Sequence, residues 1–384
     1  MTGLLPHRGP DRSPHHGARY GIVPPFLLAR IAQSEGELSD APEAARRTLG
    51  IDEPFRQGRV ERDQPGLIRH STRAELRQTV TGSTDPGWPD RLIFDGHGTE
   101  DLPGTPVRAE GEPASDDVAV NEAYDGLGET YALFWDAYER DSIDGSGMRL
   151  DATVHFGERY DNAFWDGARM VFGDGDGEVF RGFTGSISII GHELAHGVTE
   201  RTANLVYQGQ SGALNEHLSD VFGALVEQRV HKQTADQATW LVGAGIFTET
   251  VHGEAIRSMK APGTAYDDPV LGKDPQPAHM RDYVDTQDDN GGVHINSGIP
   301  NRAFVAVAEA LGGHAWERAG RVWFETLTGE RLTATATFSQ FAAATAVVAA
   351  ELYGAGSDES AAVRAAWELV GVAPGRVREK MLRE

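Results

Sequence analysis

The pentapeptide His192-Glu193-Leu194-Ala195-His196 places the tightest constraint on the fold of this 384-residue chain. Its two histidines are four residues apart, so on an α-helix they lie on one face, where both imidazoles can bind one metal ion. Glu193 then lies beside the coordination position that remains open. The pattern predicts a zinc-binding helix, although the pentapeptide alone would also fit a surface helix with two exposed histidines.

A second helical stretch, residues 211–227, supplies a third ligand. Its acids Glu216, Asp220 and Glu227 are spaced by four and seven residues and share one face. The other face is apolar and carries Leu214, Leu218, Phe222 and Leu225. Glu216 completes a set of two histidines and one carboxylate that leaves a position for water. Asp220 can accept a hydrogen bond from the far nitrogen of a ligand histidine. His217 points about 100° away and is not expected to be a ligand.

Composition and spacing exclude several other classes. The chain has no cysteine, so a metal must be held by His, Asp or Glu. Thr199 and Thr202 stand where the extended metzincin pattern needs Gly and His. A net charge of -23 and a pI near 5.0 argue against binding to nucleic acid. The longest apolar stretch, residues 341–350, is too short to span a bilayer, so no membrane segment is expected.

The N-terminal segment differs in charge from the rest of the chain. Residues 1–32 contain four arginines and one aspartate, a net charge of +3, which leaves -26 on the remainder. The segment has no apolar region of about 7–15 residues, so it is not expected to be a secretory signal peptide. After Pro24-Pro25, apolar residues at helical spacing predict a short docking helix. Residues 34–88 are polar with weak periodicity, which suggests a linker or a loosely built prodomain.

The order of the remaining elements predicts an α+β protein. A helix is expected over residues 120–138 and a strand over residues 149–157. The Gly-Asp repeats in residues 172–180 predict a tight turn that leads into another strand. From Ser186 the pattern is mostly helical, apart from residues 261–292. We therefore expect three parts: residues 1–88 as precursor segment and linker, residues 89–208 as an α+β lobe, and residues 209–384 as a helical lobe.

Six segments in order over residues 91–313 carry a family resemblance: YDNAFWDG, FGDGDG, HELAHGVTE, SGALNEHLSDVFG, EAIRSM and DNGGVHINSGIPN. With them, the chain resembles the thermolysin-like neutral metalloproteases, and in particular the protealysin-like branch with a short precursor. Residues 24–27 are similar to the PPxL-type motif of such precursors. The resemblance implies a two-lobed fold, β-rich at the N-terminus and helical at the C-terminus, with zinc in the cleft between the lobes.

The resemblance also implies catalytic roles that peptide hydrolysis requires. Glu193 would take a proton from the zinc-bound water and later pass it to the leaving amine. His294 and Tyr207 would donate hydrogen bonds to the oxyanion of the tetrahedral intermediate. Asp289 would hold His294 in a donor-competent, charged state.

Substrate contacts follow from the same resemblance. The YDNAFWDG segment is expected to be an edge strand that an extended peptide can join, with Asn162 and the Ala163 carbonyl as contacts. Arg257 would bind a substrate carbonyl on the primed side. The apolar residues that match the S1′ pocket wall predict cleavage before Leu, Phe, Ile or Val; they are Phe180, Phe183, Ile189, Val242 and Ile256.

One feature departs from the family pattern. Ser188, Thr239 and Ala244 stand where acids that bind a calcium pair are common, and Glu227 alone is kept. Because calcium prefers six to eight oxygen ligands with several carboxylates, we do not expect tight binding near the zinc helix. Other calcium sites stay open.

The leading hypothesis is therefore a zinc metalloendopeptidase made as an autoprocessing zymogen whose N-terminal segment covers the cleft. The alternative is a catalytically silent zinc-binding scaffold of the same fold; a zinc aminopeptidase ranks third, because no acidic site for the substrate amine can be located. Expected partners are protein or peptide substrates and the chain's own precursor segment, and a monomer is expected. Secretion follows from the resemblance, and a cytoplasmic precursor is the alternative.

Overall fold

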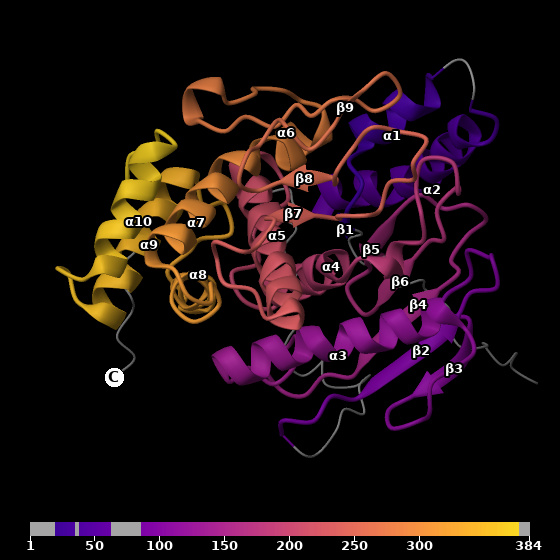
Figure 1. Ribbon diagram of the computed structural model, residues 1–384, viewed down its shortest axis with the longest axis horizontal. Helices are drawn as coiled ribbons and strands as arrows, with labels where there is room; N and C mark the ends of the chain where they lie inside the picture. The colour runs from indigo at the N-terminus through magenta and orange to yellow at the C-terminus, as the bar shows by residue number, and fades with distance from the viewer. Residues whose placement is uncertain (1–19, 35–37, 63–85, 376–384) are drawn as a thin grey trace, which may run out of the picture.

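The computed structural model describes residues 20–34, 38–62 and 86–375. In these ranges the chain forms an N-terminal lobe with a sheet, a helical C-terminal lobe, and a pair of N-terminal helices (Figure 1). Strands precede helices along the two lobes, as the sequence predicts. The architecture is thus α+β. None of the described helices is long and apolar enough to cross a bilayer.

The N-terminal lobe is built on a six-stranded sheet with the order β1-β5-β6-β4-β2-β3. Strands β2, β4 and β6 run parallel, and the outer pairs are antiparallel. Helix α3 (Val118–Tyr138) packs on this sheet and begins at Asp117, whose side chain accepts hydrogen bonds from two backbone N–H groups of the first turn. The strand bounds are β2 (Arg91–Asp95), β3 (Thr105–Ala109), β4 (Leu150–Val154), β5 (Ala163–Trp165) and β6 (Met170–Phe172).

The strand expected after the Gly-Asp turn was wrong. Beyond residue 176 the chain makes one isolated bridge, between Phe180 and Phe247, and no strand before the next helix. The Asp176 side chain explains this, because its Oδ1 accepts hydrogen bonds from the N–H groups of residues 178, 179 and 180. Those N–H groups are therefore not available to pair with a neighbouring strand.

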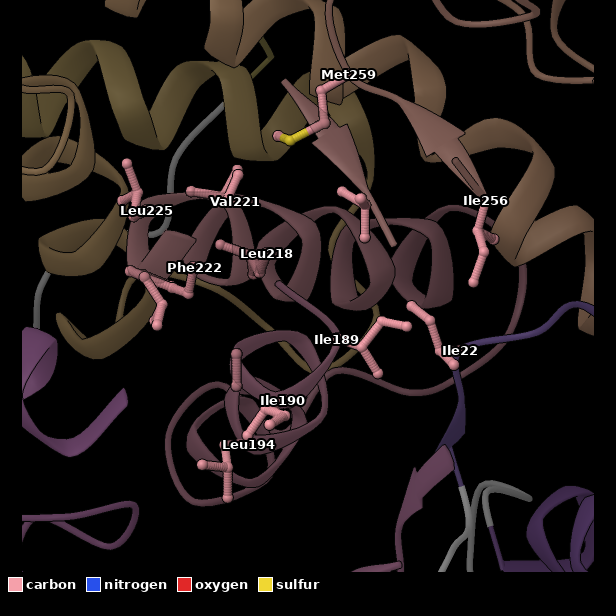
Figure 2. Packing of buried hydrophobic residues seen from close by; sticks show 14 of the residues in the cluster. Ile22, Ile189, Ile190, Leu194, Leu218, Val221, Phe222, Leu225, Ile256 and Met259 are labelled. Atoms are coloured by element: carbon pink, nitrogen blue, oxygen red, sulfur yellow. The ribbon is translucent and has the colours of Figure 1, made fainter. Parts of the chain in front are cut away.

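Two helices at the centre of the molecule carry the metal-binding pattern. Helix α4 (Ile187–Glu200) and helix α5 (Gly209–His231) form the most extensive helix–helix contact of the fold. They approach closely at two glycines: a Cβ on Gly191 would lie 3.0 Å from the Gly223 Cα, and a Cβ on Gly223 would lie 2.4 Å from the Ser188 carbonyl oxygen. Figure 2 shows the apolar side chains that surround this crossing.

The rest of the C-terminal lobe packs around α5. Its helices are α6 (Asp289–Asn296), α7 (Gly298–Leu311), α8 (Ala319–Thr328), α9 (Phe338–Tyr353) and α10 (Asp358–Leu369). Two short hairpins connect α5 to α6, and they consist of β7 (Leu241–Val242) with β8 (Arg257–Ser258) and β9 (Asp267–Asp268) with β10 (Gly272–Lys273). His217 is buried in this lobe between Asn301 and Trp323, and burial lowers its pKa to about 4, so it is a neutral core histidine as expected.

The N-terminal segment is more regular than its composition suggests. Strand β1 (Tyr20–Gly21) is followed by the predicted helix, α1 (Pro25–Ala32), and then by α2 (Ala41–Arg62). Within residues 34–88, where a linker or loose prodomain was expected, α2 is a regular helix over residues 41–62, and residues 35–37 and 63–85 lie outside the described residues. Ala44, Ala45 and Thr48 give α2 a buried face, and its N-terminus is capped by a distant residue that no local pattern could reveal.

Candidate active site

The three predicted metal ligands converge where α4 crosses α5. His192, His196 and Glu216 are fully buried. The two histidine Nε2 atoms lie 3.1 Å apart, and each lies 3.5 Å from one oxygen of Glu216. Buried imidazole and carboxylate donors that face one another in this way match the donor set of a catalytic zinc site. The residues present therefore fit zinc.

Glu193 lies next to this set. One ligand atom of Glu193 lies within 4.8 Å of those of His192 and His196. Its Oε2, however, accepts a hydrogen bond of 3.0 Å from the N–H of Trp165 in β5. That contact turns the Glu193 carboxylate toward the strand, whereas the two Glu216 oxygens each lie 3.5 Å from the Nε2 atom of one histidine.

Both ligand histidines have partners at their far nitrogens. His192 Nδ1 lies 2.8 Å from Asp220 Oδ1. His196 Nδ1 lies 2.8 Å from Asn215 Oδ1 and 3.0 Å from Ser219 Oγ. Such contacts fix the ring orientation and direct Nε2 to the metal. The sequence reasoning missed Asn215 and Ser219, although their spacing of four residues repeats that of Glu216 and Asp220 one position earlier.

Asp220 also holds a buried cation. Arg257 donates to both of its oxygens, with Nη2 at 2.8 Å from Oδ1, and Asn301 Nδ2 donates to Oδ2 at 2.8 Å. Burial alone would raise the pKa of Asp220, but Arg257 and His192 hold it well below its usual range. Asp220 is therefore ionised and forms a buried salt bridge with Arg257.

His294, Asp289 and Tyr207 form a second group beside the metal ligands. The loop before His294 reverses sharply, since Asp289, Asn290 and two glycines all have positive φ. His294 Nδ1 lies 2.6 Å from Asp289 Oδ1, and its Nε2 lies 3.1 Å from the Tyr207 hydroxyl. The hydroxyl donates to Glu216. Burial would lower the pKa of His294, but the carboxylates of Asp289 and Glu216 raise it overall, which favours an imidazolium donor.

The chain's own residues 21–23 occupy the predicted substrate contacts. Ile22 N–H donates to the Ala163 carbonyl at 3.1 Å, and Val23 N–H donates to Asn162 Oδ1 at 3.0 Å. The Ile22 carbonyl accepts from Arg257 Nη1 at 3.1 Å. His294 Nε2 lies 3.2 Å from the Gly21 carbonyl oxygen. Strand β1 thus adds to β5 antiparallel, and the edge strand predicted from YDNAFWDG is covered by the N-terminal segment.

The predicted S1′ residues are buried in the large apolar cluster that forms the main core of the molecule. Ile22 is fully buried in the same cluster, and Figure 2 shows its side chain with those of Ile189 and Ile256. The cluster includes all five predicted wall residues, which are Phe180, Phe183, Ile189, Val242 and Ile256.

Helix α2 is held over the sheet edge by polar contacts that the sequence did not reveal. Asp52 accepts hydrogen bonds from the Tyr160 hydroxyl at 2.6 Å and from Asn162 Nδ2 at 3.0 Å. Glu178 accepts from the N–H groups of residues 39, 40 and 41 and from the Ser39 hydroxyl. These donors, with the Ser39 hydroxyl first, lower the pKa of Glu178 to about 2. Glu178 therefore caps a helix that begins 137 residues earlier in the chain.

The position of the expected calcium acids is filled by protein contacts. Ser188 Oγ accepts the Gly243 N–H at 3.1 Å. Burial raises the pKa of Glu227, against a smaller opposing effect of a hydrogen bond with Ser188.

Comparison with known proteins places these features in a family. The model of the thermolysin metallopeptidase catalytic domain matches residues 94–200, and that of the thermolysin metallopeptidase alpha-helical domain matches residues 203–372. An extracellular metalloprotease of Pectobacterium carotovorum subsp. carotovorum is 46% identical over 94% of this chain and 98% of its own length. Protease PrtS of Photorhabdus sp. (strain Az29) is 52% identical over 92% of each chain. The solved precursor of protealysin, a metalloproteinase from Serratia proteamaculans, superposes with a TM-score of 0.82 at 48% identity, over 92% of this chain and all of that one.

Proposed function

The chain belongs to the thermolysin-like zinc metallopeptidases, in their protealysin-like branch, and we propose that this metalloendopeptidase is made as a zymogen whose residues 20–62 block its own cleft. The observation that carries the proposal is the occupation of the substrate contacts by residues 21–23. A peptide bound in this way excludes a substrate from the same edge strand. The likeness to a solved precursor supports the same conclusion.

The catalytic roles follow from the placement of each group. Zinc held by His192, His196 and Glu216 would supply a polarised carbonyl and an acidified water. Glu193 would take the proton of that water and deliver it to the leaving nitrogen. His294 and Tyr207 would stabilise the oxyanion by donating hydrogen bonds, with Asp289 keeping the imidazole charged.

The proposed specificity is for bulky apolar residues after the cut bond. The buried cluster around Ile189 and Ile256 already accepts the side chain of Ile22. Burial of such a side chain contributes about 1.5–3 kcal/mol that a polar residue cannot match. We expect a peptide library to show preference for Leu, Phe, Ile or Val at this position; preference for Asp, Lys or Arg would contradict the assignment.

One experiment tests activity and zymogen character together. Purified full-length protein is incubated with zinc, and the loss of the N-terminal segment and the digestion of casein are followed, with Glu193→Ala in parallel. We expect the wild-type chain to lose the segment and then to digest casein, and the variant to do neither. If both proteins stay intact and neither digests casein, the silent-scaffold alternative is favoured.

Further proposals concern the setting of the enzyme. We propose that it acts outside the cell on proteins or peptides as a monomer, since the relative from P. carotovorum is named extracellular. We also propose that residues 1–88, 89–208 and 209–384 are its structural units and that it binds no calcium near the zinc helix.

A further inference from the structure

One peptide bond of the N-terminal segment lies where a substrate bond would be cut. Building on the zymogen function proposed above, we infer that the enzyme hydrolyses its own Gly21–Ile22 bond and so produces a chain that begins at Ile22 while helices α1 and α2 stay docked. This cut is separate from the one beyond α2 that would release the blocking helices.

The register of the segment determines which bond is presented. The N–H and carbonyl of Ile22 bind Ala163 and Arg257, and the next N–H, of Val23, binds Asn162. Asn162 and the Ala163 carbonyl are the expected edge-strand contacts of a substrate, and Arg257 is the group expected to bind the carbonyl of a residue after the cut. The preceding carbonyl, of Gly21, lies 3.2 Å from Nε2 of His294, the group assigned to the oxyanion. A segment that ran in the opposite direction could not match all four contacts in this order.

The side chains on both sides of the bond fit a substrate. Ile22 is fully buried, and Figure 2 shows its side chain with those of Ile189 and Ile256, two of the predicted S1′ wall residues, as expected for the residue after the cut. At position 21 a Cβ would lie 2.6 Å from Asn162 Nδ2, so glycine permits the close approach of the segment to the strand. The Gly21–Ile22 bond is therefore held on one side by the packing of the Ile22 side chain and on the other by the close approach of the Gly21 backbone to Asn162.

An open pocket reaches the Gly21 side of this bond. The pocket, of about 730 Å³, lies between α1 and residues 284–295, and its lining includes Gly21, Tyr207 and His294. In the reaction, the oxygen of a water molecule bonds to the Gly21 carbonyl carbon and the bond to the Ile22 nitrogen breaks. Glu193 carries one proton of the water to that nitrogen, and the other passes from the new carboxyl group to the amine, so the products are a carboxylate at Gly21 and an ammonium group at Ile22.

The cut would not by itself free the cleft. The contacts of Val23 with Asn162, of Asp52 with Tyr160, and of Glu178 with the start of α2 all involve residues beyond the cut. The apolar face of α1 also stays in place, since Leu27, Leu28 and Ile31 are fully buried. Trimming at Ile22 would therefore precede activation, and maturation would take two ordered cuts.

Mass spectrometry of the intact full-length protein tests the order of the two cuts. After addition of zinc we expect a species that has lost residues 1–21 to appear first, and species cut beyond residue 62 to appear later. Glu193→Ala should remain full length. Ile22→Asp, which places a carboxylate in the apolar cluster, should slow the first cut at least 100-fold, whereas the conservative control Ile22→Leu should stay within about threefold of wild type.

A second measurement needs no activity. In metal-free Glu193→Ala protein we expect the N–H groups of Ile22 and Val23 to be protected from hydrogen exchange, and Ile22→Asp in this background to lose that protection while α2 keeps its own. If wild-type protein digests casein and loses α2 but never yields a chain that begins at Ile22, the trimming proposal is wrong and the zymogen proposal stands. If neither cut nor casein digestion occurs, the proposed function itself fails.

Discussion

At the metal centre His192, His196 and Glu216 are completely buried, whereas the polar groups that hold helix α2 against the N-terminal lobe range from buried to exposed; Thr48, Tyr160 and Asn162 are buried, and Ser39 and Glu158 are exposed. Each ligand histidine has a further buried partner in α5. On the docking face, the ion pair of Arg47 with Glu158 leaves their side chains 37% and 76% exposed. The docking face therefore combines buried polar contacts with exposed ion pairs, whereas the three metal ligands are all buried.

The difference matches what each region has to do. A buried polar network is costly to break, because every lost partner leaves a desolvated group behind. Exposed pairs contribute about 0–1 kcal/mol each, so they set the position of a segment without fixing it permanently. We infer that the contacts at the metal centre stay intact during activation, whereas the contacts that dock α2 are released. The following changes test that contrast, from the largest expected effect to the smallest.

Asp220→Ala should have the largest effect, because it removes the partner of both Arg257 and His192. An unpaired buried arginine should destabilise the protein by about 3–5 kcal/mol, and loss of the histidine partner should weaken zinc binding about 10–100-fold. Urea unfolding and competition with a zinc chelator measure the two effects. Asp236→Ala removes an exposed acid as the control. A stability change below about 0.5 kcal/mol for Asp220→Ala would contradict the inference that buried polar contacts at the metal centre are costly to lose.

Asp161→Asn tests burial on the docking side. Asp161 is fully buried, its N–H donates to Thr48 of α2, and burial with the nearby Asp176 carboxylate raises its pKa to about 9. Because this folded pKa lies above the ordinary value of 3.8, the stability contribution of Asp161 is complete below pH 3.8 and declines as the pH rises toward 9. An asparagine side chain cannot titrate, but its amide N–H can donate a hydrogen bond to the Asp176 carboxylate as a protonated Asp161 would.

We therefore expect Asp161→Asn to raise the melting temperature by several degrees at pH 8 and to leave it almost unchanged at pH 4. Thermal unfolding at pH 4, 6 and 8 measures the difference in slope. Parallel curves for the variant and the wild type would mean that Asp161 is not protonated in the folded protein, and that burial on this face does not act as it does at the metal centre.

Glu178→Gln should have a smaller effect, confined to docking. Loss of the charge that caps α2 should weaken docking by about 1 kcal/mol, or roughly fivefold. The pKa of Glu178 is lowered to about 2 from 4.5, so its contribution is present above pH 4.5 and is lost as the pH falls toward 2. In Glu193→Ala protein, adding Glu178→Gln should make hydrogen exchange of α2 faster at pH 7, and the difference between the two proteins, compared at the same pH, should shrink as the pH falls from 4.5 toward 2.

Glu158→Gln serves as the matched control, since Glu158 pairs with Arg47 of the same helix but is far more exposed. Its α2 exchange should stay within error of wild type. Equal effects of the two variants would show that the capping geometry of Glu178 adds nothing to a surface ion pair.

The same contrast explains how far sequence reasoning could go. His192, His196, Glu216 and Asp220 were predictable because helical spacing alone puts them on facing surfaces. Glu178 and Asp52 were not, since their partners lie 137 and 110 residues away and no periodic pattern links them. The strand expected after the Gly-Asp turn did not form for a related reason: the side chain of Asp176 accepts hydrogen bonds from the backbone N–H groups of residues 178–180 that a strand would need.

The smallest effect is expected from calcium. Ser188 is bonded to Gly243, and Glu227 is the one acid kept of the expected set, so this place lacks the several carboxylates that calcium prefers. Millimolar CaCl2 should therefore shift the melting temperature of wild type by less than about 2 °C. Ser188→Asp should lower it by adding a second carboxylate beside Glu227, and calcium should restore part of the loss in this variant alone. A large calcium shift in wild type would mean that a cation, and not the contact of Ser188 with Gly243, joins α4 to the segment after α5, which would extend the buried metal centre beyond zinc.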